Sequence, residues 1–275
     1  MSSLATYFKN NSTIIHLSSK DRQFGGSDGE FQYTPTQNVR FNKSNEALIH
    51  LSSCVIPCSF YNIPDGDNTL YFGIYQISTT TETIYTITIT PNNYTLDTLA
   101  AEVQSKMRTA TGLSTLTVTL NSPMMLYTIN TANSDYHIQL KQPSYSSSNK
   151  VAVSLGFYYF DYYYEYKYKV YESPYSQIIT SPEVSQLDIY EISIHSSLAK
   201  QSLCHNKPAF IFEVIPLNTP QGGVSQWQAR LEHNHVVNQQ QLSSFSIQFF
   251  RNDIQKTVDF NGCSPSLTFI INISD

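Results

Sequence analysis

Charged residues are scarce in this sequence, and catalytic motifs are absent. Only 13% of the residues are Asp, Glu, Lys or Arg, the formal net charge is -5, and no Lys/Arg cluster occurs. Counterion release would therefore drive nucleic-acid binding only weakly, so we expect no sequence-specific nucleic acid as a partner. The chain has no nucleophile elbow, zinc-protease motif, P-loop or dinucleotide fingerprint. We therefore expect a protein that is not an enzyme and that has no catalytic residue, metal or cofactor.

Long apolar runs are also missing. No run approaches the roughly 20 residues that a bilayer-spanning helix needs, and the first residues lack the charged and apolar regions of a signal peptide. We therefore expect a soluble protein that is made without secretion and has no transmembrane segment.

Candidate metal ligands are few and scattered. The sequence contains four cysteines, Cys54, Cys58, Cys204 and Cys263. This number fits a reducing compartment better than a disulfide scaffold. Cys54 and Cys58 are separated by Pro57, and we interpret them as small buried residues. His233 and His235 would share one face of a strand, but no third ligand lies near them in sequence, so we predict solvated loop histidines.

Strand-forming residues are abundant. The chain of 275 residues contains 20 tyrosines, and strands accept Tyr, Thr and β-branched residues readily. Residues 46–63 predict a strong apolar strand, and residues 83–90 alternate apolar and polar side chains with the strand period of two. Turn residues suggest that residues 46–63 and 70–77 form one hairpin, and that residues 245–250 and 266–273 form another.

A single stretch, Tyr94–Gly112, predicts a helix. Thr95 is suited to cap its amino end and Gly112 to end it. The apolar residues recur at the spacing of one helical face, and they are Leu96, Leu99, Ala100, Val103 and Met107. A lone helix in a β-rich chain has no other helix to pack on. We therefore expect it to cover an open edge or end of a sheet sandwich.

The fold class predicted by this pattern is all-β. We expect an antiparallel, eight-stranded jelly-roll sandwich with one amphipathic helix, and with the extra strands in insertions. Residues 1–41 are polar and contain several glycines, so we predict an N-terminal arm outside the core. Residues 42–275 are predicted to form a single jelly-roll domain.

An aromatic run occupies residues 157–171, with rings on both faces of a predicted strand. We take it, together with the sole tryptophan, as a candidate interaction surface made of Tyr158, Tyr159, Tyr162, Tyr164, Tyr166, Tyr168 and Trp227. Three interpretations stay open. The rings stack on sugars or bases, form cross-strand pairs within a hairpin, or are buried against a neighbouring subunit.

Several segments, taken in order, resemble the capsid jelly-roll proteins of double-jelly-roll DNA viruses. These include virophages, polinton-like viruses and nucleocytoplasmic large DNA viruses. The segments are EALIHLSSCVIPCSFYNI, NTLYF, YTLDTLAAEVQ, LTVTLNSPMMLYTI, KVAVSLGF and SFSIQFFRNDIQKTVDFNGCSPSLTFIINI. Major capsid proteins of that group hold two jelly rolls in a longer chain. The present length fits one jelly roll, and so resembles their penton protein.

The resemblance implies a structural protein of the virion capsid, made in the host cytoplasm. It implies a homopentamer, or penton, at the five-fold vertices of an icosahedral shell, with the double-jelly-roll major capsid protein as a partner. Other minor capsid proteins or a vertex fibre are further expected partners. The dense aromatic run allows an insertion around residues 157–186 for host or fibre attachment. The alternatives are a minor cement protein, or a receptor-binding spike that binds carbohydrate, in the same type of virus.

Overall fold

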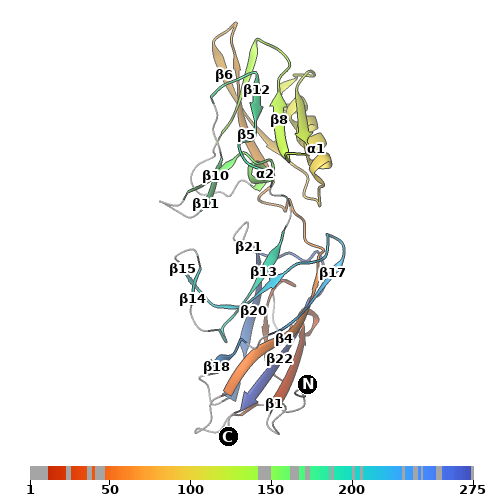
Figure 1. Ribbon diagram of the computed structural model, residues 1–275, viewed down its shortest axis with the longest axis vertical. Coiled ribbons are helices and arrows are strands. Elements are labelled where there is room, and N and C mark those ends of the chain that lie inside the picture. Colours follow the sequence, from red (N-terminus) through yellow and green to blue (C-terminus); the bar gives the residue numbers. More distant parts are fainter. Residues whose placement is uncertain are drawn as a thin grey trace. The chain divides into compact units, whose positions relative to one another are not determined.

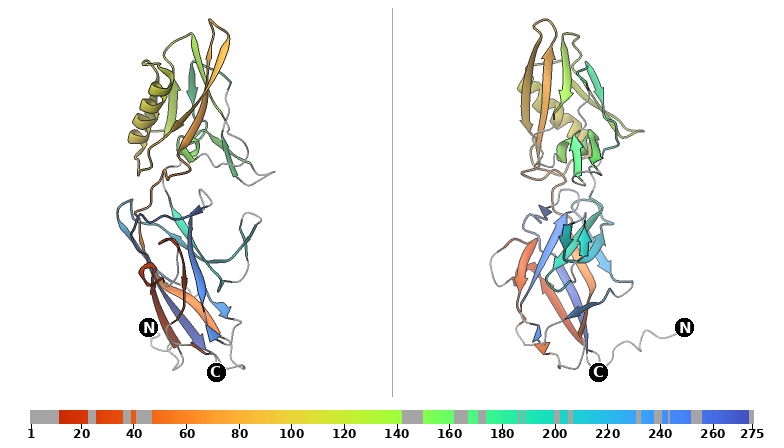
Figure 2. Two further views of the ribbon diagram at one scale, coloured as in Figure 1. Left: turned by 180° about the vertical axis from the view of Figure 1, so that it is seen from behind. Right: turned by 90° about the vertical axis from the view of Figure 1, so that its left-hand side faces the viewer.

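The chain divides into two units in this computed structural model (Figures 1 and 2). Met1–Phe60 and Ile189–Asp275 form one, called here the sandwich unit, and Tyr61–Asp188 form the other, called the inserted unit. The structure describes residues 12–22, 26–35, 39–40, 47–141, 150–161, 167–170, 174–185, 187, 189–199, 202–204, 207–230, 233–237, 241–242, 244–251 and 256–273.

Eight strands of the sandwich unit form two antiparallel sheets. In spatial order, the first sheet contains β1 (Ser12–Ser18), β22 (Ser266–Ile273), β4 (Ala47–Pro57) and β17 (Val224–Gln228). The second sheet contains β16 (Ile211–Pro216), β13 (Glu191–Ser196), β20 (Phe245–Arg251) and β2 (Glu30–Tyr33). If these eight strands are numbered from one to eight along the chain, their spatial order is 1-8-3-6 in the first sheet and 5-4-7-2 in the second sheet. This is the strand order of a jelly roll, so the predicted all-β fold is confirmed.

Short elements surround these sheets. Added to β4 is β18 (His235–Val237), and added to β20 is β21 (Lys256–Thr257). Two further pairs are β3 (Val39–Arg40) with β19 (Gln241–Leu242), and β14 (Ser202–Cys204) with β15 (Lys207–Ala209). A 3-10 helix, η2 (Ser19–Asp21), follows β1.

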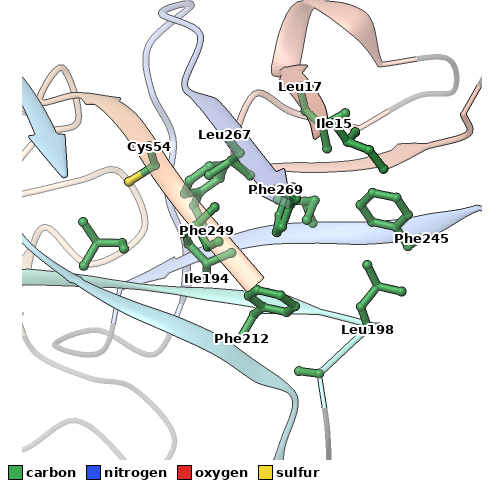
Figure 3. Close-up of a cluster of buried hydrophobic side chains, with 14 of the residues drawn as sticks. Ile15, Leu17, Cys54, Ile194, Leu198, Phe212, Phe245, Phe249, Leu267 and Phe269 are labelled. Atoms are coloured by element: carbon green, nitrogen blue, oxygen red, sulfur yellow. The ribbon is translucent and has the colours of Figure 1, made fainter. Parts of the chain in front are cut away.

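The period-two pattern of the strands places one face of each sheet in a shared core. Along β20, Phe245, Ile247 and Phe249 are buried while the residues between them are half-exposed. Figure 3 shows the apolar side chains of the two sheets directed towards one another. The ring of Phe269 in the first sheet meets Phe212 and Phe245 of the second edge-on, with centroids 5.3 and 6.2 Å apart. Such edge-to-face pairs each contribute about 0.5–1.5 kcal/mol beyond area burial.

The predicted N-terminal arm outside the core is wrong for β1 and β2. β1 pairs with β22 over its 7 residues, and Ile15 and Leu17 are buried in the sandwich core. β2 pairs with β20, and Phe31 is buried there. Each strand is short and flanked by polar residues, so the composition of residues 1–41 concealed two core strands. Residues 1–11 lie outside the described residues.

The inserted unit has two sheets of its own. The third sheet contains β6 (Thr81–Thr88), β5 (Thr69–Gln76) and β9 (Tyr136–Leu140), in that order. The fourth sheet contains β12 (Ile178–Thr180), β8 (Leu126–Asn130) and β7 (Thr117–Asn121). Ser176 pairs with Ile138 of β9 just before the chain enters β12, so this segment links the two sheets. Their inner faces share a core separate from that of the sandwich unit.

This division differs from the expected single domain at residues 42–275 with an insertion at 157–186. The insertion begins at Tyr61 and includes the helix, because it closes a core of its own. Both predicted hairpins are wrong as well. β4 and β5 belong to different units, and β20 and β22 lie in different sheets of the sandwich.

The long helix α1 (Leu96–Thr111) covers part of two sheet edges in the inserted unit, as expected. Thr95 caps its amino end and Gly112, with φ of 73°, ends it in the left-handed conformation. Its buried face packs near the edge strands β6 and β7. The Gln104 side-chain oxygen accepts the Val118 N–H of β7 at 2.9 Å. Helix side chains thus satisfy backbone groups that an edge strand leaves unpaired.

Candidate interaction surfaces

The aromatic run folds in part as a hairpin. β10 (Tyr158–Asp161) pairs antiparallel with β11 (Lys167–Val170), which places Tyr159 opposite Lys169 and Phe160 opposite Tyr168. Tyr158 is only 6% exposed, so its ring offers no open face for stacking. Tyr162, Tyr164 and Tyr166 lie outside the described residues, as do the side chains of Tyr159 and Tyr168. For these five, the interaction surface stays a prediction.

Trp227 is separate from this hairpin, because it belongs to the sandwich unit. It lies on β17 opposite Cys54 of β4, and it is half-buried against the jelly-roll core. Its ring therefore contributes to packing rather than to an exposed platform.

Exposed apolar side chains occur on both outer faces of the jelly roll. Val55 and Val224 are 37% and 52% exposed on the outer face of the first sheet. On the outer face of the second sheet, Val214 of β16 is 38% exposed. Single exposed apolar side chains are common on protein surfaces, and these valines mark positions where a substitution can test a contact.

His233 and His235 connect the two sheets at one edge. His233 Nδ1 lies 2.9 Å from Oε2 of Glu213, whose side chain is largely buried. His235, on β18, is half-buried, donates from Nε2 to the Phe212 carbonyl at 3.0 Å and stacks on the Phe212 ring. The prediction of solvated histidines is therefore wrong for His235, because its ring packs between β18 of the first sheet and Phe212 of the second.

The cysteines of the described residues behave as buried or isolated thiols. Cys54 and Cys58 are buried and free, whereas Cys263 is exposed. Burial, with a contribution from the Glu213 carboxylate, raises the pKa of Cys54 to about 12. Within the described part of the chain, no group of three or more His, Cys, Asp or Glu side chains is placed to hold a metal. None of the described helices is both long and apolar enough to cross a bilayer.

A polar cluster that the sequence analysis missed lies on the outer face of the third sheet. The Tyr175 hydroxyl donates to the Glu82 carboxylate, and Lys141 Nζ lies 3.1 Å from the same carboxylate. The hydrogen bond from the Tyr175 hydroxyl is the largest cause that lowers the pKa of the Glu82 carboxyl, and the hydrogen bond from Lys141 is the second. A Cβ at Gly73 would collide with the Tyr175 hydroxyl oxygen, so the glycine makes room for this side chain. A lone glycine inside an apolar strand was the available signal.

These features define a class of fold: an eight-stranded jelly roll with a second β-rich unit inserted between its third and fourth strands. The chain is similar in structure to the mavirus penton protein, known from a crystal structure of its selenomethionine-labelled form. The TM-score is 0.52 at 11% sequence identity, and the likeness covers 96% of this chain and 100% of that chain. At this identity the likeness shows a shared fold. No protein-family model matches the sequence, and no curated protein matches it.

Proposed function

We propose that this protein is a structural component of a viral capsid and not an enzyme. The observation that carries the proposal is the jelly roll together with its inserted unit, a fold shared with a penton protein over 96% of this chain and 100% of that chain. Jelly rolls build capsid shells by packing side by side. The virion is then its location, with synthesis in the host cytoplasm.

The more specific proposal is a homopentamer at the five-fold vertices of an icosahedral double-jelly-roll virus. A closed ring needs two different complementary surfaces on each copy. The two outer faces of the sandwich, marked by Val224 and Val214, are the candidates, because both expose apolar side chains. The double-jelly-roll major capsid protein would surround the ring, and other minor capsid proteins or a fibre would attach to it.

Native mass spectrometry of the purified chain tests the oligomer. The expected species has about five times the chain mass of 31.2 kDa. A strict monomer that also fails to enter particles when co-expressed with a major capsid protein would reject the proposal. A trimer found between major capsid proteins would favour the cement role instead.

Two lysine substitutions test the proposed faces. Val224→Lys and Val214→Lys each place a charge in one half of the contact, and each is expected to lower the pentamer fraction. Met124→Lys is the matched control, because Met124 is 58% exposed in a turn of the inserted unit. If the control disrupts the ring equally, or if neither valine variant does, the contact lies elsewhere.

A further inference from the structure

Strand β6 has an outer edge that its neighbours leave open. In β5, the Tyr71 carbonyl accepts the N–H of Lys141, and the Ile77 N–H donates to the carbonyl of Asp135. Odd-numbered residues of β5 therefore direct their backbone groups towards β9, and even-numbered residues direct theirs towards β6. The register pairs those even residues with Thr81, Thr83, Tyr85 and Ile87. The outward row consequently consists of Glu82, Ile84, Thr86 and Thr88.

All four residues of this outward row are exposed. Among the hydrogen bonds of the described residues, none involves the backbone N–H or C=O of these four. The next residue in the row, Thr90, is treated differently, because Glu102 of α1 accepts from its N–H at 3.4 Å and from its hydroxyl at 3.0 Å. Side chains of α1 thus bond to the backbone at Thr90, at the end of the β6 edge, and at Val118 on the edge of β7. They do not reach the outward backbone groups of Glu82, Ile84, Thr86 and Thr88.

The usual protections of an edge strand are missing from β6. Its 8 residues, TETIYTIT, contain no proline and no basic residue, and its register with β5 has no bulge. Its single charge, Glu82, is held on the face of the sheet by Tyr175 and Lys141. Ile84 remains 54% exposed. Such a long edge, without a bulge and partly apolar, is a template for another strand.

We propose that the β6 edge binds an extended peptide segment of a partner chain, which adds to the third sheet as a further strand. Backbone donors and acceptors recur along this edge at about 6.8 Å, the two-residue repeat of a strand, and an extended peptide carries complementary groups at the same spacing. The added strand would place alternate side chains beside Tyr85. That ring is stacked on Phe72 with centroids 5.4 Å apart, so apolar residues are favoured there.

A partner chain fits better than a second copy of this protein, and this choice rests on the proposed pentamer. Antiparallel pairing of two β6 edges is a two-fold contact. Five copies in one ring cannot satisfy it in pairs, whereas five separate peptides fill five edges.

Residue-resolved amide exchange on the full chain provides the first test. In the free protein, the amides of the outward row should exchange fast and those of Thr83, Tyr85 and Ile87 slowly. Slow exchange of the outward amides would overturn the proposal, because the edge would already be occupied. Slowing that appears only as protein concentration rises would assign the edge to a second copy, and would overturn the choice of partner.

A displayed library of random octapeptides, selected on the full chain, provides the probe for the second test. A selected peptide should slow exchange at Glu82, Ile84, Thr86 and Thr88 while leaving the alternate residues unchanged. Binding through side chains alone would not produce this alternation. Failure to select any peptide, or protection without alternation, would overturn the proposal.

Thr86→Pro removes one outward N–H while keeping the ladder to β5, and it should weaken the selected peptide about tenfold or more. Thr86→Val keeps the N–H and should bind normally. Equal binding by both variants would place the peptide elsewhere. If Thr86→Pro unfolds the unit, the alternating exchange pattern of the native chain decides. Thr86→Pro should leave the oligomer mass unchanged, so failure of the pentamer and failure of the edge site are distinguishable.

Discussion

Replacing Leu17 by alanine tests whether the start of the chain is a core strand or an arm. Leu17 is 0% exposed and lies opposite Leu267 in the first sheet. Deleting a buried leucine side chain to alanine costs roughly 2–5 kcal/mol, the range depending on how far the surroundings collapse. Ile14→Ala is the control in the same strand, because Ile14 is 60% exposed and its truncation should cost about 0.5 kcal/mol or less.

Differential scanning calorimetry at one fixed protein concentration measures the effect. A domain of this size loses about 2–4 °C in Tm per kcal/mol, so Leu17→Ala should lower the melting temperature of the sandwich unit by roughly 4–20 °C. The two units have separate cores, and we expect two transitions. Leu99→Ala, on the buried face of α1, should lower the other transition.

The result that would refute this reasoning is a melting curve for Leu17→Ala that matches Ile14→Ala. Residues 12–18 would then contribute no core burial, and β1 would be a detachable arm. A single transition shifted equally by Leu17→Ala and Leu99→Ala would instead show that the two units melt as one.

Three further outcomes are expected. Alkylation at pH 8, located by peptide mapping, should label Cys263 quickly and Cys54 hardly at all, because the pKa of Cys54 is raised to about 12 by burial; equal labelling would contradict its placement in the core. Gly73→Val should lower the Tm of the inserted unit by displacing the Tyr175 ring, and an unchanged Tm would show that the ring does not rest there. The pKa of Glu82 is lowered in the folded state, so its stabilisation is present above the unfolded pKa and is lost as pH falls through the folded one. The Tm of the inserted unit should therefore fall more between about pH 6 and pH 3 in the native chain than in Glu82→Gln, and parallel curves would argue against the cluster.

Elements whose signal is local were predictable from the sequence. The closing strand at residues 266–273 has the predicted bounds, because apolar residues recur at every second position from Leu267 to Ile273. The helix was predicted with its cap residues, since Thr95 and Gly112 each have a single well-defined role at a helix end. The all-β class followed from the number of such strands, although two of the eight jelly-roll strands, β1 and β2, were predicted to lie in the arm.

Pairings between distant segments were not predictable in the same way. β20 and β22 are neighbours in sequence with a turn between them, yet they pack face to face across the core. The boundary at Tyr61 has no linker composition, because the chain passes between units directly after a strongly apolar strand. Tyr158 has the same residue type as the other five candidate tyrosines, so its burial by the fold could not be read from the sequence.

The placement of a self-contained unit between the third and fourth jelly-roll strands gives the chain two cores that pack independently. Substitutions at residues 61–188 are absorbed by a core that the sandwich does not share. A substitution inside the inserted unit can therefore be accommodated by local repacking, without repacking the core of the jelly roll.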